Sequence, residues 1–230
     1  MKDILKNIFY KTYKPFSKIN TQFFSGGFSN LGYFIKSEAL YNTLNAKEVK
    51  DRNVMHEELS SIYVDPSMKI CFLEFGVYKG QSFAVWAGNN KNPASIFTGF
   101  DTFTGIPEDW GKEKKGSYSA KGNLPDIQDS RVKFEIGLIQ DTLPPFLINI
   151  HKGIKKVIHI DVDLYNATLF SLVYLQPFLE KGDIIIFDDF FTITKAAYEF
   201  RAFYDFLSLF KIEYRPLVKC RRGHLAIEIV

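Results

Sequence analysis

The sequence predicts a doubly wound α/β fold with a mostly parallel sheet and a helical extension at its N-terminus. From about residue 69 onward, short apolar runs alternate with stretches of helical spacing. This is the pattern of a parallel sheet covered by helices on both faces. The chain has 230 residues, of which 46% are hydrophobic, so one large domain can bury a substantial core.

The expected strands are continuous apolar runs bounded by turn residues. They cover residues 69–75, 96–100, 132–136, 157–160 and 184–187, and two later runs, 212–218 and 224–230, are able to pair antiparallel at one edge. Helical spacing lies between them and follows them, beginning at 81–87 and continuing at 168–179 and 194–210. The alternation indicates strand–helix–strand units rather than an all-β domain.

Residues 1–64 are expected to form an N-terminal arm and helical cap, and residues 65–230 the main domain. The first 30 residues carry five lysines against one acid, Asp3, and reach a flexible SGG segment at 25–27. We expect this arm to pack on its own domain or on the partner subunit of a homo-oligomer, because Pro15 interrupts its amphipathic pattern. Weak contact with a membrane surface is the alternative. Residues 29–64 are expected to be helical.

Composition excludes several classes of protein. The net charge of +3 is too small to indicate nucleic-acid binding, and no run approaches the about 20 apolar residues of a membrane span. Two cysteines, Cys71 and Cys220, form neither a disulfide framework nor a metal-site spacing. The sequence therefore predicts a cytoplasmic protein without a transmembrane segment.

The segment EFGVYKG, residues 74–80, links the first main strand to a helix. Gly76 permits a tight turn, and Gly80 permits close packing of the helix. A dinucleotide fingerprint needs a second glycine where Tyr78 stands, and Glu74 repels a phosphate. The segment therefore favours S-adenosylmethionine over a dinucleotide.

Asp101 ends the second strand, 25 positions beyond Gly76. A carboxylate at that position can accept hydrogen bonds from both hydroxyls of a ribose. The alternative is a turn or helix N-cap aspartate.

Five segments together resemble class I S-adenosylmethionine-dependent methyltransferases, and most resemble the macrocin and mycinamicin sugar O-methyltransferase group. They are EFGVYKGQS, GFDTFTGIPEDW, GLIQDTLP, HIDVDLYNAT and IIIFDDF, within about residues 70–192. The resemblance implies a Rossmann-like fold with S-adenosylmethionine as cofactor. It implies that the methionine part is surrounded by Glu74, Gly76, Tyr78, Gly80 and Ser82, the ribose by Asp101, and the adenine by Thr102, Phe103 and the segment 137–141, which includes Asp141.

In two of these segments an apolar run ends in a pair of aspartates, Asp161 with Asp163 and Asp188 with Asp189. In doubly wound methyltransferases the strands that precede them are adjacent, and neighbouring strands lie about 4.8 Å apart. Asp161, Asp188 and Asp189 then form an all-oxygen site for Mg²⁺ or another hard divalent cation, and the related group holds a metal at matching positions. The alternative is an exposed turn, with Asp163 capping the next helix.

The expected activity is transfer of a methyl group to a hydroxyl of a sugar or glycosylated small molecule, in a natural-product or surface-glycan pathway. A divalent cation stabilises the developing alkoxide, and a carboxylate, Asp161 or Asp163, removes the proton. A catechol or phenol acceptor is the alternative enzyme activity, and a non-catalytic S-adenosylmethionine-binding module is the alternative outside enzymes.

The histidines carry little signal in the sequence. His159 lies within a strand and is expected to be a packed core residue. His56, His151 and His224 are isolated along the chain, and surface positions are expected for all three.

Overall fold

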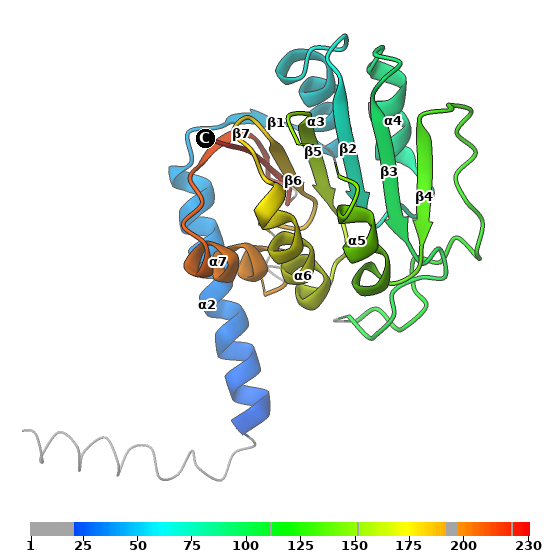
Figure 1. Ribbon diagram of the computed structural model, residues 1–230. Helices are drawn as coiled ribbons and strands as arrows, with labels where there is room; N and C mark the ends of the chain where they lie inside the picture. The colour runs from blue at the N-terminus through cyan, green and yellow to red at the C-terminus, as the bar shows by residue number, and fades with distance from the viewer. Residues whose placement is uncertain (1–20, 111, 151, 192–196, 222) are drawn as a thin grey trace, which may run out of the picture.

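A computed structural model describes residues 21–110, 112–150, 152–191, 197–221 and 223–230, with side chains from residue 31 onward. This part of the chain forms an eight-stranded sheet with the order β1-β7-β8-β6-β5-β2-β3-β4 (Figure 1). The strands are β1 (Lys47–Val49), β2 (Ile70–Phe75), β3 (Ile96–Asp101), β4 (Val132–Ile136), β5 (Lys155–Ile160), β6 (Ile184–Phe187), β7 (Tyr214–Cys220) and β8 (Leu225–Ile229). Only β8 runs antiparallel to its neighbours, β6 and β7.

Helices cover both faces of the sheet, as the sequence predicts. They are α2 (Thr21–Thr43), α3 (Arg52–Glu58), α4 (Gln81–Asn89), α5 (Ile139–Leu147), α6 (Tyr165–Leu175) and α7 (Glu199–Leu209), with a π-helical turn at Leu59–Tyr63 and a 3₁₀ turn at Gln176–Phe178. In Figure 1, α3 and α4 lie behind the sheet and α5, α6 and α7 in front. Two apolar clusters fill the two interfaces, one with Met55 and Trp86 and the other with Leu172 and Phe206.

The central strands are apolar throughout because both of their faces are covered. Every residue of β2 and β6 is buried. In the register of the sheet, Ile160 of β5 lies beside Phe75 of β2 and Phe187 of β6. The residues that follow these three strands therefore emerge side by side at one edge, where ligands bind in doubly wound folds.

The region before residue 65 differs from the expectation in two ways. The segment expected to be helical, 29–64, contains strand β1, which pairs parallel with β7 and so extends the sheet. This strand has three residues and only Val49 is buried, too short for a period to be recognised in the sequence. The SGG segment at 25–27 is part of α2 rather than a flexible end, since glycine disfavours a helix by only about 1 kcal/mol.

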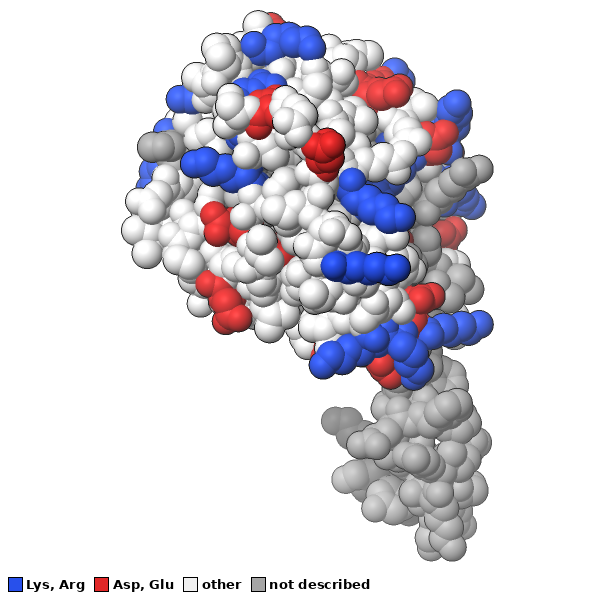
Figure 2. Space-filling model, turned by 90° about the vertical axis from the view of Figure 1, so that its right-hand side faces the viewer, with Lys and Arg blue, Asp and Glu red and all other residues white. Residues whose placement is uncertain are grey.

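Helix α2 contacts α7 and extends beyond the sheet (Figure 1). The basic residues of the first 20 positions lie outside the described residues. No described helix combines the length and the apolar character that crossing a membrane requires. The face beside β4, turned toward the viewer in Figure 2, carries basic side chains interspersed with acidic ones.

Candidate active site

A cavity of ≈ 510 Å³ opens at the carboxyl ends of the strands. Its lining comes from the glycine turn after β2, the end of β3, the loop that follows it, the turn before α5, and the segments after β5 and β6. These segments are far apart in sequence and meet only because their strands are neighbours. The cavity therefore brings the sequence motifs together at one place.

Gly76 forms the floor of the glycine turn and has no room for a side chain. Its φ is +84°, a conformation that other residues rarely adopt, and a Cβ there would lie 1.8 Å from the backbone oxygen of Asp161. The close approach of β2 and β5 at this point thus requires glycine. Gly80 is also left-handed, as the N-cap of α4, and a Cβ on it would meet Pro125.

Asp101 holds the glycine turn in place. Its carboxylate accepts hydrogen bonds from the backbone N–H groups of Val77 (2.8 Å) and Tyr78 (2.7 Å) with one oxygen, and from that of Phe103 (2.7 Å) with the other. Asp101 also lines the cavity. The side chain expected to bind a ribose is therefore placed at the cavity wall and organises the backbone around it.

The other expected cofactor residues divide into two groups. Tyr78 and Thr102 line the cavity together with Gly76 and Asp101. Glu74 and Ser82 lie beneath the turn, fully or almost fully buried, and the Ser82 hydroxyl donates to Glu74 at 2.6 Å. These two support the turn from below.

Two expected adenine contacts lie away from the cavity lining. Phe103 is 1% exposed and packs edge-on against Phe134 in the core. Asp141 is exposed in the first turn of α5, whereas the preceding residues 137–140 line the cavity. The segment therefore reaches the cavity through residues 137–140 and not through Asp141.

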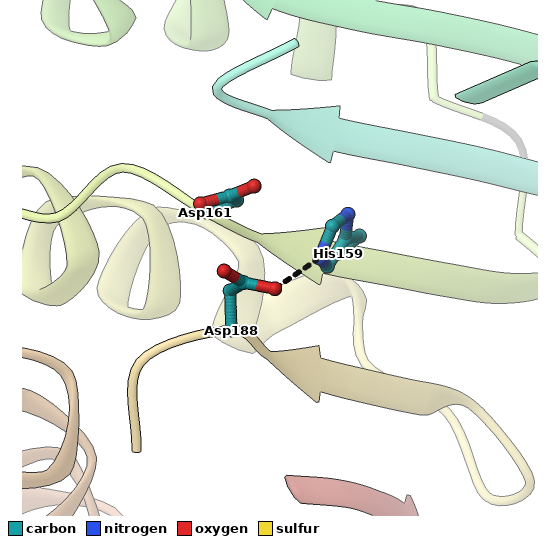
Figure 3. A group of neighbouring side chains, drawn as sticks. All are labelled: His159, Asp161 and Asp188. Atoms are coloured by element: carbon teal, nitrogen blue, oxygen red, sulfur yellow. Dashed lines mark ion pairs between the residues drawn. The ribbon is translucent and has the colours of Figure 1, made fainter. Parts of the chain in front are cut away.

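The carboxylates of Asp161 and Asp188 face each other at the ends of β5 and β6 (Figure 3). One ligand atom from each of them and one from His159 all lie within 4.8 Å of one another. Asp189 and Asp163 line the same cavity. Asp163 has φ +62°, and the N-cap of α6 is the next residue, Leu164.

Arg52, which lies outside the sequence motifs, is placed between the two facing carboxylates. Its guanidinium contacts Asp161 Oδ2 at 2.7 Å through Nη2 and Asp188 Oδ1 at 3.2 Å through Nε. The same Nη2 donates to the Ser82 hydroxyl at 3.2 Å. No periodicity marks this residue, because it is the first residue of α3 and reaches the site only through the tertiary fold.

His159 is buried, as the sequence predicts, whereas His56 and His224 are more buried than expected. His159 is fully buried, and its Nδ1 lies 3.4 Å from Glu74 and its Nε2 3.9 Å from Asp188. His224 is 9% exposed, with Nδ1 3.1 Å from Asp188, and His56 is 2% exposed and accepts a hydrogen bond from Trp86. Surface positions for His56 and His224 are therefore wrong, because both pack around this cluster. His151 lies outside the described residues.

The pKa values of the residues in this cluster are shifted in different directions. Burial raises the pKa of Asp161, Asp188 raises it further, and despite Arg52 it reaches about 7. Burial also acts to raise the pKa of Asp188. Hydrogen bonding to His159 and His224 outweighs this effect, and the pKa of Asp188 lies well below its usual value. Burial opposes charge on His159, yet Asp188 and Glu74 raise its pKa to about 9. Asp188 is thus the fixed anion, and Asp161 exchanges a proton near neutral pH.

A second carboxyl with a raised pKa lies behind the cluster. Burial, and then the charges of Asp189 and Asp188, raise the pKa of Glu199 well above its usual value. Glu199 is fully buried at the start of α7, and it accepts a hydrogen bond from the backbone N–H of Asp189 at 2.9 Å. Its contact fixes the backbone of the Asp188–Asp189 pair.

The donor set fits a hard divalent cation. The aspartates offer carboxylate oxygens, which Mg²⁺ prefers, and one ligand atom each of Asp161 and Asp188 lies within 4.8 Å of the other. The cationic Arg52 presently offsets the charge of the pair. The site thus has the ligands for a cation and already contains a competing one.

Comparison with known proteins agrees with this geometry. Residues 55–213 match the macrocin-O-methyltransferase (TylF) family. No curated protein sequence matches the chain.

Solved structures of similar fold include three O-methyltransferases. The chain matches CalS11, a TDP-rhamnose 3′-O-methyltransferase of calicheamicin biosynthesis, with 24% identity and a TM-score of 0.57, covering 76% of this chain and 78% of that one. It matches NovP with 19% identity and a TM-score of 0.59, covering 76% and 78%. It matches an O-methyltransferase from Bacillus cereus in complex with SAH with 16% identity and a TM-score of 0.53, covering 88% and 90%.

The structural matches confirm the expected methyltransferase fold, and the family match covers most of the residues that build the cavity. The chain therefore belongs to the macrocin-O-methyltransferase (TylF) family and is an S-adenosylmethionine-dependent O-methyltransferase.

Proposed function

We propose that this protein methylates a hydroxyl group of a sugar or glycosylated small molecule, in a natural-product or surface-glycan pathway, with Mg²⁺ or another hard divalent cation at its aspartate cluster. The observation that carries the proposal is the placement of Asp161 and Asp188. They end adjacent strands and line the same cavity as the glycine turn, so a cation between them is within the same space as a methyl donor and an acceptor.

The cofactor side of the cavity is the wall formed by the glycine turn and the end of β3. Gly76 and Asp101 both line the cavity at this wall. The Glu74–Ser82 pair supports this wall from below. Catalysis on this side consists of holding the donor in line with the acceptor oxygen.

The aspartates divide two tasks between them. Asp161, Asp188 and Asp189 supply the carboxylate oxygens of the metal site, and a bound divalent cation supplies the Lewis acidity that stabilises a developing alkoxide. Asp163 lines the cavity two residues beyond Asp161, and in this proposal it accepts the proton of the acceptor hydroxyl. Asp161, with a pKa of about 7, is the other candidate for that proton.

Tyr118, whose ring contacts that of Tyr78 at the cofactor wall, supports a sugar acceptor. Tyr78 and Tyr118 are 38% and 48% exposed, and their ring centroids lie 6.4 Å apart in an edge-on arrangement. Both have a left-handed backbone, with φ of +52° and +59°. Residues other than glycine adopt this conformation at an energetic cost, and it occurs at functional sites. An aromatic ring with a polar tip suits the mixed apolar and hydroxylated faces of a sugar.

The descriptions of the family and of one structural relative also support a sugar acceptor. The family is described as macrocin-O-methyltransferase, and CalS11 is described as a TDP-rhamnose 3′-O-methyltransferase. A nucleotide-linked deoxysugar is therefore the first acceptor class to test. Phenols are the second, because two adjacent phenolic oxygens are able to chelate a cation held by the same aspartates.

The test is an acceptor screen with S-adenosylmethionine carrying a radiolabelled methyl group. The panel contains nucleotide-linked deoxysugars, glycosylated natural products and catechols, each with Mg²⁺ and with EDTA. We expect labelling of a sugar hydroxyl that EDTA abolishes and added Mg²⁺ restores. Asp188→Asn should lose this activity, while Asp126→Asn, an exposed aspartate on the β3–β4 connection, should keep it.

Two results would contradict the proposal. Labelling of catechols without labelling of any sugar would replace the acceptor class. Turnover that is unchanged by EDTA, together with full activity of Asp188→Asn, would remove the metal from the mechanism.

A further inference from the structure

Arg52 connects the aspartate pair to the glycine turn. Its guanidinium contacts Asp161, Asp188 and the hydroxyl of Ser82, at 2.7, 3.2 and 3.2 Å. The side chain is 34% exposed and lines the cavity. Arg52 precedes the residues that match the family, which begin at residue 55, so the family match assigns it no role.

Arg52 is held at this place by the start of α3. The helix begins at Arg52, with Asp51 as its N-cap, whose carboxylate accepts a hydrogen bond from the backbone N–H of Val54 at 3.0 Å. Strand β1 ends two residues before the cap and is fixed to β7. The backbone of Arg52 is thus anchored, so only its side chain would have to move to release the aspartates.

The contacts of Arg52 use the oxygens that a divalent cation needs. Asp161 Oδ2 lies 2.7 Å from Nη2, and the two oxygens of Asp188 lie 3.2 and 3.3 Å from Nε and Nη1. A metal ion that binds these oxygens has to come as close to them as the guanidinium does. Because two cations cannot share so small a space, the guanidinium and the ion exclude each other there.

We propose that Arg52 is an exchangeable counter-cation: it occupies the aspartate pair in the metal-free protein and is displaced from it when a divalent cation binds. The inference rests on the metal site proposed above. After displacement, Arg52 keeps one of its present partners, the hydroxyl of Ser82. This hydroxyl is not part of the aspartate pair. The guanidinium then remains at the glycine turn, beside the space assigned to the amino-acid part of the cofactor.

This arrangement couples the metal to the cofactor. S-adenosylmethionine and S-adenosylhomocysteine both carry a carboxylate, which a displaced guanidinium is suited to bind. A cofactor that draws Arg52 away from the aspartates makes metal binding easier, and by linkage the metal makes cofactor binding easier to the same degree. Arg52 is therefore a positioning residue that acts on both sites.

The test measures Mn²⁺ binding to the full-length protein by electron paramagnetic resonance, which detects the free ion and requires no turnover. We expect Arg52→Met to bind Mn²⁺ at least about tenfold more tightly than the wild type, because charge-assisted hydrogen bonds of this kind no longer compete. Arg52→Gln, which keeps a donor for Ser82, should show the same direction, and Arg52→Lys should lie between. Equal or weaker Mn²⁺ binding by both neutral variants, with native circular dichroism, would overturn the proposal.

The matched control is Arg215→Met. Arg215 is also paired with a carboxylate, Glu228, but lies at the opposite end of the sheet. The substitution changes the net charge by the same amount, so an effect of overall charge would appear in it as well. We expect its Mn²⁺ affinity to equal that of the wild type, and a rise as large as that of Arg52→Met would count against local competition.

A second experiment measures the effect of S-adenosylhomocysteine on Mn²⁺ binding. Added to the wild type it should tighten Mn²⁺ binding, and this effect should be lost in Arg52→Met. An effect of equal size in both proteins would contradict the link between Arg52 and the cofactor.

Asp188→Asn separates a failure of this inference from a failure of the metal site. Loss of Mn²⁺ binding in Asp188→Asn, with no change in Arg52→Met, would keep the site and reject the exchange. Mn²⁺ binding that persists in Asp188→Asn would reject the site itself.

Discussion

Gly76 and Asp161 touch across two neighbouring strands: a Cβ on Gly76 would lie 1.8 Å from the backbone oxygen of Asp161. The glycine turn and the aspartate cluster are therefore one structural unit. A change at the turn is transmitted to the backbone of the residue that also contacts Arg52.

Gly76→Ala should damage both stability and cofactor binding. The new methyl group meets backbone at 1.8 Å, and φ of +84° is strained for alanine, which together should lower the free energy of unfolding by about 2 kcal/mol or more. Urea unfolding and calorimetry with S-adenosylhomocysteine measure the two effects. Gly88→Ala is the control, because Gly88 lies in α4 with open space around it and should gain stability. Native-like stability of Gly76→Ala would show that the strands separate easily at this point.

Asp101→Ala should loosen the glycine turn. The substitution leaves the backbone N–H groups of Val77, Tyr78 and Phe103 without their acceptor, and each unsatisfied donor costs about 1–3 kcal/mol where it is buried. We expect affinity for S-adenosylhomocysteine to fall at least about tenfold, as measured by calorimetry. Asp126→Asn is again the control. Unchanged affinity would mean that Asp101 contacts neither the cofactor nor the turn that holds it.

Mn²⁺ binding should strengthen as the pH rises toward neutrality. Burial and Asp188 raise the pKa of Asp161 to about 7, so a proton competes with the metal below that pH. Affinity should increase about tenfold per pH unit below 7, for one proton displaced, and level off above it. The same paramagnetic resonance titration at several pH values measures this. Asp163→Asn, outside the metal set, should keep the profile, and a flat profile between pH 5.5 and 7 would contradict the assignment of Asp161.

The sequence predicts the fold well because its main signal is local. The run IIIF at 184–187 is buried on both faces, and the strand has the expected bounds. The aspartates follow from the same signal, since a residue that directly follows a central parallel strand must lie at the ligand-binding edge. Asp161, Asp163, Asp188 and Asp189 all line the cavity.

The side chains that surround those aspartates cannot be identified from the sequence. Arg52, His56 and His224 come from elements before and after the segments of the resemblance, and they approach Asp188 only through the pairing of β1, β7 and β8. Strand β1 itself is too short to show a period. Side chains that converge from distant elements leave no local pattern in the sequence. This part of the site can therefore be identified only from the tertiary structure.

Lys156→Met should destabilise the protein without affecting the cavity. Lys156 is fully buried in β5, 3.2 Å from Asp183, which is 1% exposed, and removal of one partner of a buried pair leaves the other charge uncompensated, at a cost of about 3 kcal/mol. Burial already raises the pKa of Asp183, and loss of the lysine raises it further. The folded variant then binds a proton more tightly than the unfolded chain, so its stability falls as the pH rises through the folded-state pKa of Asp183.

Urea unfolding between pH 4 and 8 measures this deficit, which should be smallest at pH 4. Lys156 lies at the end of the sheet opposite the aspartate cluster, since Ile160 is the residue of β5 that precedes Asp161. Calorimetry with S-adenosylhomocysteine should therefore give the same affinity for Lys156→Met as for the wild type. A loss of affinity would show that the two ends of β5 are coupled, and a deficit that shrinks as the pH rises would contradict a buried, uncompensated Asp183.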